Sequence, residues 1–186
     1  PHVTEPISWH QGLTLPKTTS SRVLFVDNLD SFSWNIVHAF CTLGTEVVIV
    51  PGRLNSSDSV QLLTQINPTH VVLGPGPGRP EQSPLTMQFA QAALQGETPP
   101  LLGICLGHQA LGLAAGWDLN PSEYGAVHGV PDGIQSGDVM QIMTRYHSLA
   151  LTPNNDILRV TATDSATNKL VMAIQHPECP VSGVQY

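Results

Sequence analysis

The sequence is poor in charge and in long apolar runs, and each shortage excludes a class of protein. Only 11% of its 186 residues are charged, with 7 Lys and Arg against 14 Asp and Glu, and no basic run occurs. Nucleic-acid binding depends on clustered basic side chains, so we expect no nucleic-acid partner. No apolar stretch approaches the roughly 20 residues that a membrane helix needs, so we expect no membrane partner either.

Cysteines are also few. Cys41, Cys105 and Cys179 are odd in number and lack metal-ligand spacing, so we expect neither a disulfide framework nor a metal site. A reducing compartment, the cytoplasm, fits this cysteine usage. Residues 1–21 are polar and rich in Pro, Thr and Ser, without the charged start and apolar core of a signal peptide. We predict that they form a tail or linker and that residues 22–186 form one domain.

Strand and helix patterns alternate through the first 115 residues. Short apolar runs rich in branched side chains predict buried strands at 22–26, 46–50, 70–73 and 101–104. A helix is predicted after each strand: one with Phe32, Ile36, Phe40 and Leu43 near one face, one capped by Asp58, one over 84–95 and one over 107–115. This alternation predicts an α/β fold, a doubly wound and mainly parallel sheet with helices on both faces.

The second part of the chain has a different pattern. Residues 116–138 are rich in Gly, Pro and Asp and are predicted to be mostly loop. Short strands are predicted at 139–144, 157–163, 169–175 and 181–186, and the last two should form a hairpin around His176–Pro180. We therefore predict an antiparallel strand addition to the parallel sheet.

The first chemical signal is Gly103–Gln109, which follows a buried strand, where open α/β sheets bind ligands. Its G-x-C-x-G pattern between a strand and a helix predicts a sharp turn that exposes Cys105 as a nucleophile. The helix N-terminus would stabilise the thiolate, and the Leu106 N–H would face a forming oxyanion. A buried structural cysteine is the alternative that the pattern alone leaves open.

The second signal is Gly74–Gly78, which follows another buried strand and alternates Gly with Pro. Such a loop is rigid, and its glycine N–H groups can donate to a substrate carbonyl. It lacks the Gly-Lys-Ser/Thr ending of a phosphate loop, and Arg79 breaks the dinucleotide-binding pattern. A plain tight turn is the alternative.

The third signal is Tyr146–Leu149. His147 could be a base or a ligand, although a lone histidine is more often structural. Ser148 and Leu149 could offer backbone groups to a small ligand.

Together these segments resemble the class I glutamine amidotransferases, and more narrowly the glutaminase subunit or domain of anthranilate synthase and aminodeoxychorismate synthase. The resemblance covers about residues 22–186 and implies a flavodoxin-like fold. It rests on five segments: Val26–Asn35, Leu73–Gly78, Gly103–Gln109, Tyr146–Leu149 and Gly183–Tyr186.

The resemblance implies that Cys105 attacks the side-chain amide of L-glutamine through a thioester and that ammonia passes to a chorismate-binding synthase, as a separate subunit or a fused domain. No cofactor is expected in this domain, and Mg²⁺ is expected only in the partner. Residues 125–131 and 146–151 favour the aminodeoxychorismate branch slightly, and His128 receives no chemical role. The oxyanion hole is assigned to the N–H groups of Gly76 and Leu106, and substrate contacts to Gln109, Ser148 and Leu149, with Pro77 and Gly78 nearby.

The base is a separate question. In this family a His-Pro-Glu directly follows Gly-Val-Gln-[Phe/Tyr], and this sequence ends at Tyr186, so we expect a chain cut just before that motif and a poor or inactive glutaminase. The other candidate, His176–Glu178, would lie at the hairpin turn, roughly 20 Å from any residue after Tyr186. We therefore predict that His176 and Glu178 are not the working pair.

Three other readings remain open. One is another cysteine hydrolase on a flavodoxin-like sheet, and a second is a catalytically dead glutamine-binding or interaction module of the same fold. The third, a flavodoxin-like nucleotide binder, is disfavoured because the sequence lacks a phosphate loop.

Overall fold

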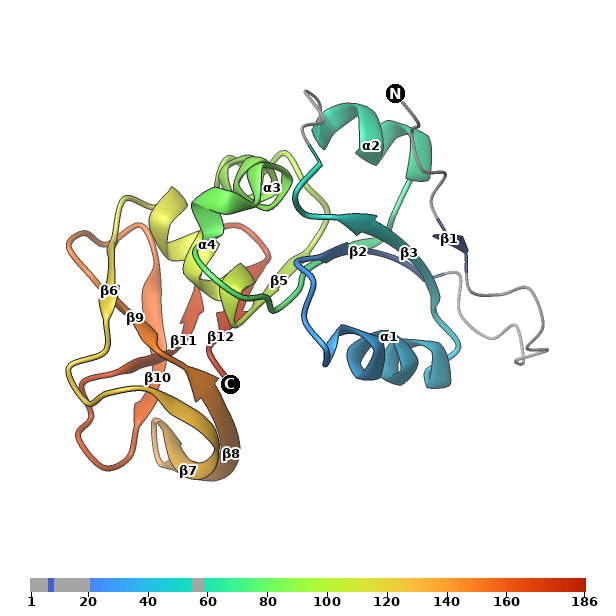
Figure 1. The fold of residues 1–186 in the computed structure, drawn as a ribbon. Helices are drawn as coiled ribbons and strands as arrows, with labels where there is room; N and C mark the ends of the chain where they lie inside the picture. The colour runs from blue at the N-terminus through green and yellow to red at the C-terminus, as the bar shows by residue number, and fades with distance from the viewer. Residues whose placement is uncertain (1–6, 9–20, 55–58) are drawn as a thin grey trace.

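The computed structural model describes residues 7–8, 21–54 and 59–186, and within them ten strands form one sheet (Figure 1). At its centre the order is β3-β2-β4-β5-β12, with every neighbouring pair parallel. This order is typical of a doubly wound sheet and confirms the predicted fold class. The five strands are β2 (Arg22–Asp27), β3 (Glu46–Pro51), β4 (His70–Leu73), β5 (Leu101–Ile104) and β12 (Val181–Val184).

Helices cover both faces of this parallel core, as predicted. On one face lies α1, whose apolar residues pack against the β2–β3–β4 strands. The other face carries α2, α3 and α4, which share the largest hydrophobic cluster with the strands. The helices are α1 (Ser33–Thr42), α2 (Ser59–Ile66), α3 (Pro84–Leu94) and α4 (Leu106–Ala114), with a short 3-10 helix, η1 (Pro80–Gln82), before α3.

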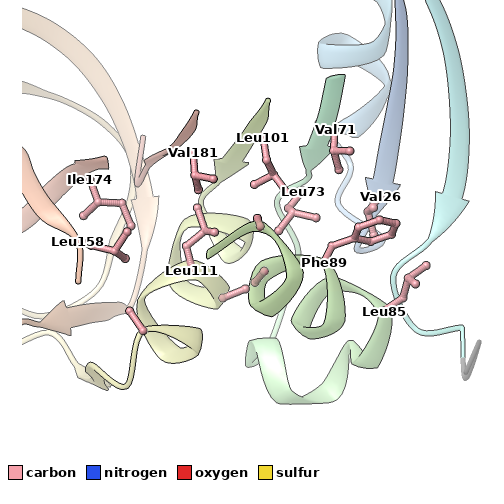
Figure 2. Packing of buried hydrophobic residues seen from close by; sticks show 14 of the residues in the cluster. Val26, Val71, Leu73, Leu85, Phe89, Leu101, Leu111, Leu158, Ile174 and Val181 are labelled. Atoms are coloured by element: carbon pink, nitrogen blue, oxygen red, sulfur yellow. The ribbon is translucent and has the colours of Figure 1, made fainter. Parts of the chain in front are cut away.

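The larger cluster is what fixes α3 and α4 against the sheet. Figure 2 shows Phe89 of α3 and Leu111 of α4 pointing toward Val26, Leu73 and the other strand residues. Phe89, Leu73 and Leu111 are fully buried. Full burial of each such side chain contributes about 1.5–3 kcal/mol relative to exposure, so this cluster holds α3 and α4 on the sheet.

The face of α1 differs from the prediction. Val37 is buried, whereas Phe32 is 58% exposed and Leu43 is 70% exposed. Both lie outside the helix, one residue before its start and one after its end, so the helical periodicity does not bring them to the sheet. The Asp58 cap predicted for the next helix falls outside the described residues.

Antiparallel strands extend the sheet beyond β12, as predicted. The order continues β11 (Val171–Gln175), β10 (Arg159–Asp164), β7 (Val127–Ser136) and β8 (Val139–His147). The predicted β11–β12 hairpin is confirmed, with Ala173 opposite Val184 and Gln175 opposite Ser182. At the other edge β1 (Ile7–Ser8), within the segment expected to be a tail, pairs with β3.

The prediction of loop over 116–138 was wrong. Residues 118–121 form β6, which pairs with β9 (Leu149–Thr152), and residues 127–136 form β7. Pairing with β8 makes β7 a strand despite Pro131 and its glycines, and the register shifts at Gly129, whose φ is 74°. Glycine tolerates that positive φ, so a composition typical of loops here marks a bulged strand.

None of the described helices is long and apolar enough to cross a membrane.

Candidate functional site

Cys105 stands alone between β5 and α4, at the carboxyl end of the parallel strands. Its φ of 52° and ψ of −100° lie in a region that residues with a side chain rarely adopt. Such an outlier costs of order 1–3 kcal/mol and persists only where the surroundings enforce it. The predicted sharp turn between strand and helix is therefore present, and the strain supports a functional role for this cysteine.

Two glycines allow this turn. A Cβ on Gly103 would lie 2.6 Å from the carbonyl carbon of Gly107, and a Cβ on Gly107 would overlap the carbonyl oxygen of Leu73. The first turn of α4 therefore packs directly on the ends of β5 and β4. Because Leu73 and Gly103 are paired in the sheet, this contact also sets Cys105 beside the loop that follows β4.

The thiol of Cys105 has two hydrogen-bond partners among the described residues. Its Sγ lies 3.7 Å from the carbonyl oxygen of Tyr146, and the Gln185 side-chain amide donates to Sγ at 3.4 Å. Burial, and then the carboxylate of Asp30, raise the pKa of Cys105 to about 11, against a smaller lowering by the Leu106 N–H and Gln185. The expected stabilisation of the thiolate by the helix N-terminus is thus outweighed by desolvation and by a neighbouring negative charge.

Gln185 links Cys105 to Gln109, a predicted substrate contact. The Gln109 amide donates to the Gln185 carbonyl oxygen at 3.1 Å, and both side chains are buried. Sequence reasoning used Gln185 only as part of a matching segment and did not predict this contact. The buried amide pair therefore connects the thiol to the first turn of α4.

The loop Gly74–Gly78 is anchored by Asn28, which sequence reasoning also missed. The Asn28 amide donates to the Gly74 carbonyl at 2.9 Å, and its oxygen accepts from the Thr86 hydroxyl at 2.7 Å. A Cβ on Gly76 would lie 2.5 Å from Asn28 Cβ, so the loop backbone rests directly on this residue.

The outer part of that loop is accessible. Pro77 and Gly78 are exposed and Gly76 is half-buried. These predicted substrate contacts therefore lie where a ligand could reach them, at the strand end next to Cys105.

The segment Tyr146–Leu149 reaches Cys105 from the antiparallel strands. The Tyr146 carbonyl faces Cys105, and the Ser148 hydroxyl lies 3.3 Å from Nε2 of His128. His128 also stacks on the Tyr146 ring at 4.8 Å between centroids. The Ser148 carbonyl accepts from the Ser122 N–H at 2.9 Å, and the Ser148 side chain is exposed.

His176 and Glu178 lie at the other end of the sheet. The His176 N–H donates to the carbonyl of Val181, and Val181 is paired with Leu101, four residues before Cys105. The four-residue step from Leu101 to Cys105 spans about 13 Å at about 3.3 Å per residue, so His176 lies too far from Cys105 for proton transfer. The His176 ring accepts from the N–H groups of Glu178 and Cys179, so it stabilises a turn.

The site therefore joins Cys105 to Tyr146 directly and to Gln109 through Gln185, with Gly76–Gly78 on the adjoining strand end. Exposed or half-buried residues border each part of the site except the Gln109–Gln185 amide pair, so the arrangement suits a small polar ligand held beside a thiol. Within the described residues no group of three His, Cys, Asp or Glu side chains has the arrangement of a metal site.

Comparison with known proteins gives consistent matches. The model of the family "Glutamine amidotransferase class-I" matches residues 24–186. Anthranilate synthase component 2 of Mycobacterium tuberculosis is 36% identical, covering 89% of this chain and 73% of that protein. Aminodeoxychorismate synthase component 2 of Serratia marcescens is 34% identical, covering 88% of this chain and 89% of that protein.

A solved structure supports the fold independently. A glutamine amidotransferase from Thermotoga maritima superposes with a TM-score of 0.69, at 16% identity, over 90% of this chain and 75% of that chain. At that identity the likeness concerns the fold alone.

Proposed function

The chain belongs to the class I glutamine amidotransferase family, and we propose that it hydrolyses the side-chain amide of L-glutamine, with Cys105 as the nucleophile. The observation that carries the proposal is the strained backbone of Cys105 at the turn between β5 and α4, beside two segments able to hold a ligand. A structural cysteine has no need of such a conformation.

In the proposed reaction the Cys105 sulfur forms a bond to the amide carbon and the carbon–nitrogen bond breaks. The nitrogen leaves as ammonia after taking up the thiol proton, and water then cleaves the thioester to give glutamate. The N–H groups of Leu106 and Gly76 are proposed to stabilise the oxyanion. The substrate is proposed to be held by Gln109, Ser148 and Leu149, with Pro77 and Gly78 nearby.

Removal of the thiol proton is the demanding step. A pKa of about 11 leaves little thiolate at neutral pH, and the described partners of Sγ are a carbonyl oxygen and an amide, neither of which is a base. Binding of glutamine and its hydrolysis must therefore be measured separately.

We further propose that the ammonia serves a chorismate-using synthase, as the names of the relatives suggest, through a partner subunit or fused domain. Relatives of the anthranilate and aminodeoxychorismate branches match at 36% and 34% identity, so identity does not separate the branches. We propose no cofactor for this domain, with Mg²⁺ needed only by the partner, and a cytoplasmic location, in keeping with three free cysteines.

The first test is labelling of Cys105 by a chloroketone analogue of glutamine, with Cys105→Ala as the control. Selective labelling that glutamine prevents is the expected result. Reaction no faster than with a chloroketone of unrelated shape, and no protection by glutamine, would favour an unrelated cysteine hydrolase or a structural cysteine.

The second test is glutamate release, with and without the synthase component. Cys105-dependent release supports the amidotransferase reaction. Protection by glutamine without any release under either condition would instead indicate a glutamine-binding module of the same fold. The specific observation that favours this module is that neither described hydrogen-bond partner of the Cys105 Sγ is a base.

A further inference from the structure

Buried and exposed side chains alternate at the end of β8. Tyr146 and Ser148 are exposed, whereas Arg145 and His147 are each 5% exposed. This is the two-residue alternation of a strand, so the buried pair flanks Tyr146, whose backbone carbonyl contacts the Cys105 thiol.

The two buried side chains form a continuous polar chain. Arg145 pairs with the carboxylate of Asp132 on β7, and its Nε donates to Nε2 of His147 at 3.2 Å. On the other side of the ring, Nδ1 of His147 lies 2.9 Å from the carbonyl oxygen of Leu149.

This geometry fixes the state of the imidazole. A carbonyl oxygen can only accept, so Nδ1 of His147 carries the hydrogen, and Nε2 must accept from Arg145. Burial, with smaller contributions from Arg145 and His128 against the Leu149 hydrogen bond, lowers the pKa of His147, in keeping with a neutral ring. Both ring nitrogens are occupied, so His147 cannot take the thiol proton without losing Arg145.

The chain of contacts holds the backbone on both sides of the exposed residues. The His147–Leu149 hydrogen bond spans Ser148, and the Arg145–His147 hydrogen bond spans Tyr146, whose carbonyl faces the thiol. Rotation of the peptide groups of Tyr146 or Ser148 would break one of these two buried hydrogen bonds.

We infer that Arg145 and His147 are positioning residues for the glutamine site: through the Asp132 pair and the Leu149 carbonyl, they hold Tyr146 and Ser148 in the orientation that binds substrate beside Cys105. The inference rests on the proposed function. It assigns His147 a role in binding and none in proton transfer.

The test measures glutamine affinity without turnover. The complete chain is treated with iodoacetamide across a glutamine series, and modification of Cys105 is followed by peptide mass spectrometry, with Cys41 and Cys179 as internal references. The glutamine concentration that halves the Cys105 rate reports binding, and the rate without glutamine reports the thiol itself.

For His147→Leu we expect the half-protecting glutamine concentration to rise about 10-fold, because two hydrogen bonds that hold the segment are lost. The rate without glutamine should change less than about 2-fold. His147→Asn keeps a donor near the Nδ1 position and should recover part of the affinity. Arg145→Lys should weaken binding less than Arg145→Met, and the exposed Gln141→Ala on the same strand should bind as the unaltered chain does.

The outcomes separate the two levels of the argument. If the unaltered chain is protected by glutamine and His147→Leu and Arg145→Met are protected equally well, the positioning role is wrong and the proposed function stands. If both binding and the glutamine-free rate change together and His147→Asn recovers nothing, the two residues are structural only and the inference fails. If the unaltered chain is not protected, the proposed function fails and the inference falls with it.

Discussion

The parallel and antiparallel parts of the sheet hold their shares of the site by different means. In the parallel part, Cys105 is held by backbone packing, because Gly103 and Gly107 allow α4 to touch the ends of β4 and β5. In the antiparallel part, Tyr146 and Ser148 are held by the side chains of Arg145 and His147. The backbone contact in the parallel part is disrupted when a substitution adds an atom, because it leaves no room for one. The side-chain network in the antiparallel part is disrupted when a substitution removes one hydrogen-bond partner.

The largest effect should come from filling the backbone contact. Gly107→Ala places a methyl group against the Leu73 carbonyl oxygen, and we expect the free energy of unfolding to fall by about 3 kcal/mol or more. Denaturant titration followed by circular dichroism measures it. Gly129→Ala is the control from the antiparallel part, since nothing lies within 4 Å of its added Cβ and only the positive φ is strained, at about 1 kcal/mol. Equal losses in the two variants would show that the helix–strand contact is not tight.

The next effect concerns Cys105, where the two parts meet. Because burial, and then Asp30, raise its pKa to about 11, the thiolate fraction at pH 8 should be about 100-fold below that of a thiol with the ordinary value of 9.0. The rate of iodoacetamide modification at Cys105 should therefore rise with pH toward a midpoint near 11.

Asp30→Asn tests the second cause of that shift. It should move the midpoint toward lower pH while leaving burial in place. A midpoint at or below 9 in the unaltered chain would mean that the helix N-terminus dominates, as the sequence pattern alone suggests.

The third prediction concerns Asn28, a side-chain anchor in the parallel part. Asn28→Ala leaves the Gly74 carbonyl and the Thr86 hydroxyl without their partner, both in a buried setting, and should cost about 2.5 kcal/mol of unfolding free energy. Thr86→Val removes one of the two hydrogen bonds and should cost about 1 kcal/mol. Labelling by the glutamine chloroketone should slow more in Asn28→Ala than stability alone explains, because the Gly74–Gly78 loop loses its anchor. If the two variants are equally stable and equally reactive, Asn28 is not an anchor.

The difference between the parallel and antiparallel parts of the sheet also explains which strands the sequence could predict. Parallel strands such as β2 and β4 are mostly buried on both faces, so they are mainly runs of branched apolar residues, and their predicted bounds agree with the observed ones to within a residue. The strands β6, β7 and β9 owe their conformation to pairing partners distant in sequence. Composition alone therefore predicted loop for the first two and no strand for the third.

In the candidate site, too, features that depend on nearby residues could be predicted, and contacts between residues distant in sequence could not. The G-x-C-x-G pattern predicted the turn at Cys105 because the turn depends on nearby glycines. The contacts of Gln185 with Cys105 and of Asn28 with Gly74 join residues 80 and 46 positions apart, so only the folded topology brings them together. For His147, sequence reasoning left base, ligand and structural residue open, since its partners are set by the side of β8 it occupies.

The smallest effect should come from an antiparallel turn remote from the thiol. Burial raises the pKa of Asp164, but hydrogen bonds from the Thr167 hydroxyl and from the N–H groups of Leu170, Thr167 and Lys169 outweigh it, and the pKa is lowered. A lowered pKa stabilises the fold fully above the ordinary value of 3.8, and that contribution is lost as pH falls through the folded value.

Asp164→Asn should therefore cost about 1.5 kcal/mol at pH 7, because the ionised acceptor of these bonds is gone. Its unfolding free energy should also decline less steeply than that of the unaltered chain as the pH is lowered below about 4. Asp138→Asn, at an exposed position in the β7–β8 turn, should change neither quantity by more than about 0.5 kcal/mol. An equally steep acid decline in Asp164→Asn would assign the acid sensitivity to other carboxylates. A loss as large as that of Gly107→Ala would show that the antiparallel part depends on a single side chain as strictly as the parallel part depends on its glycine contact.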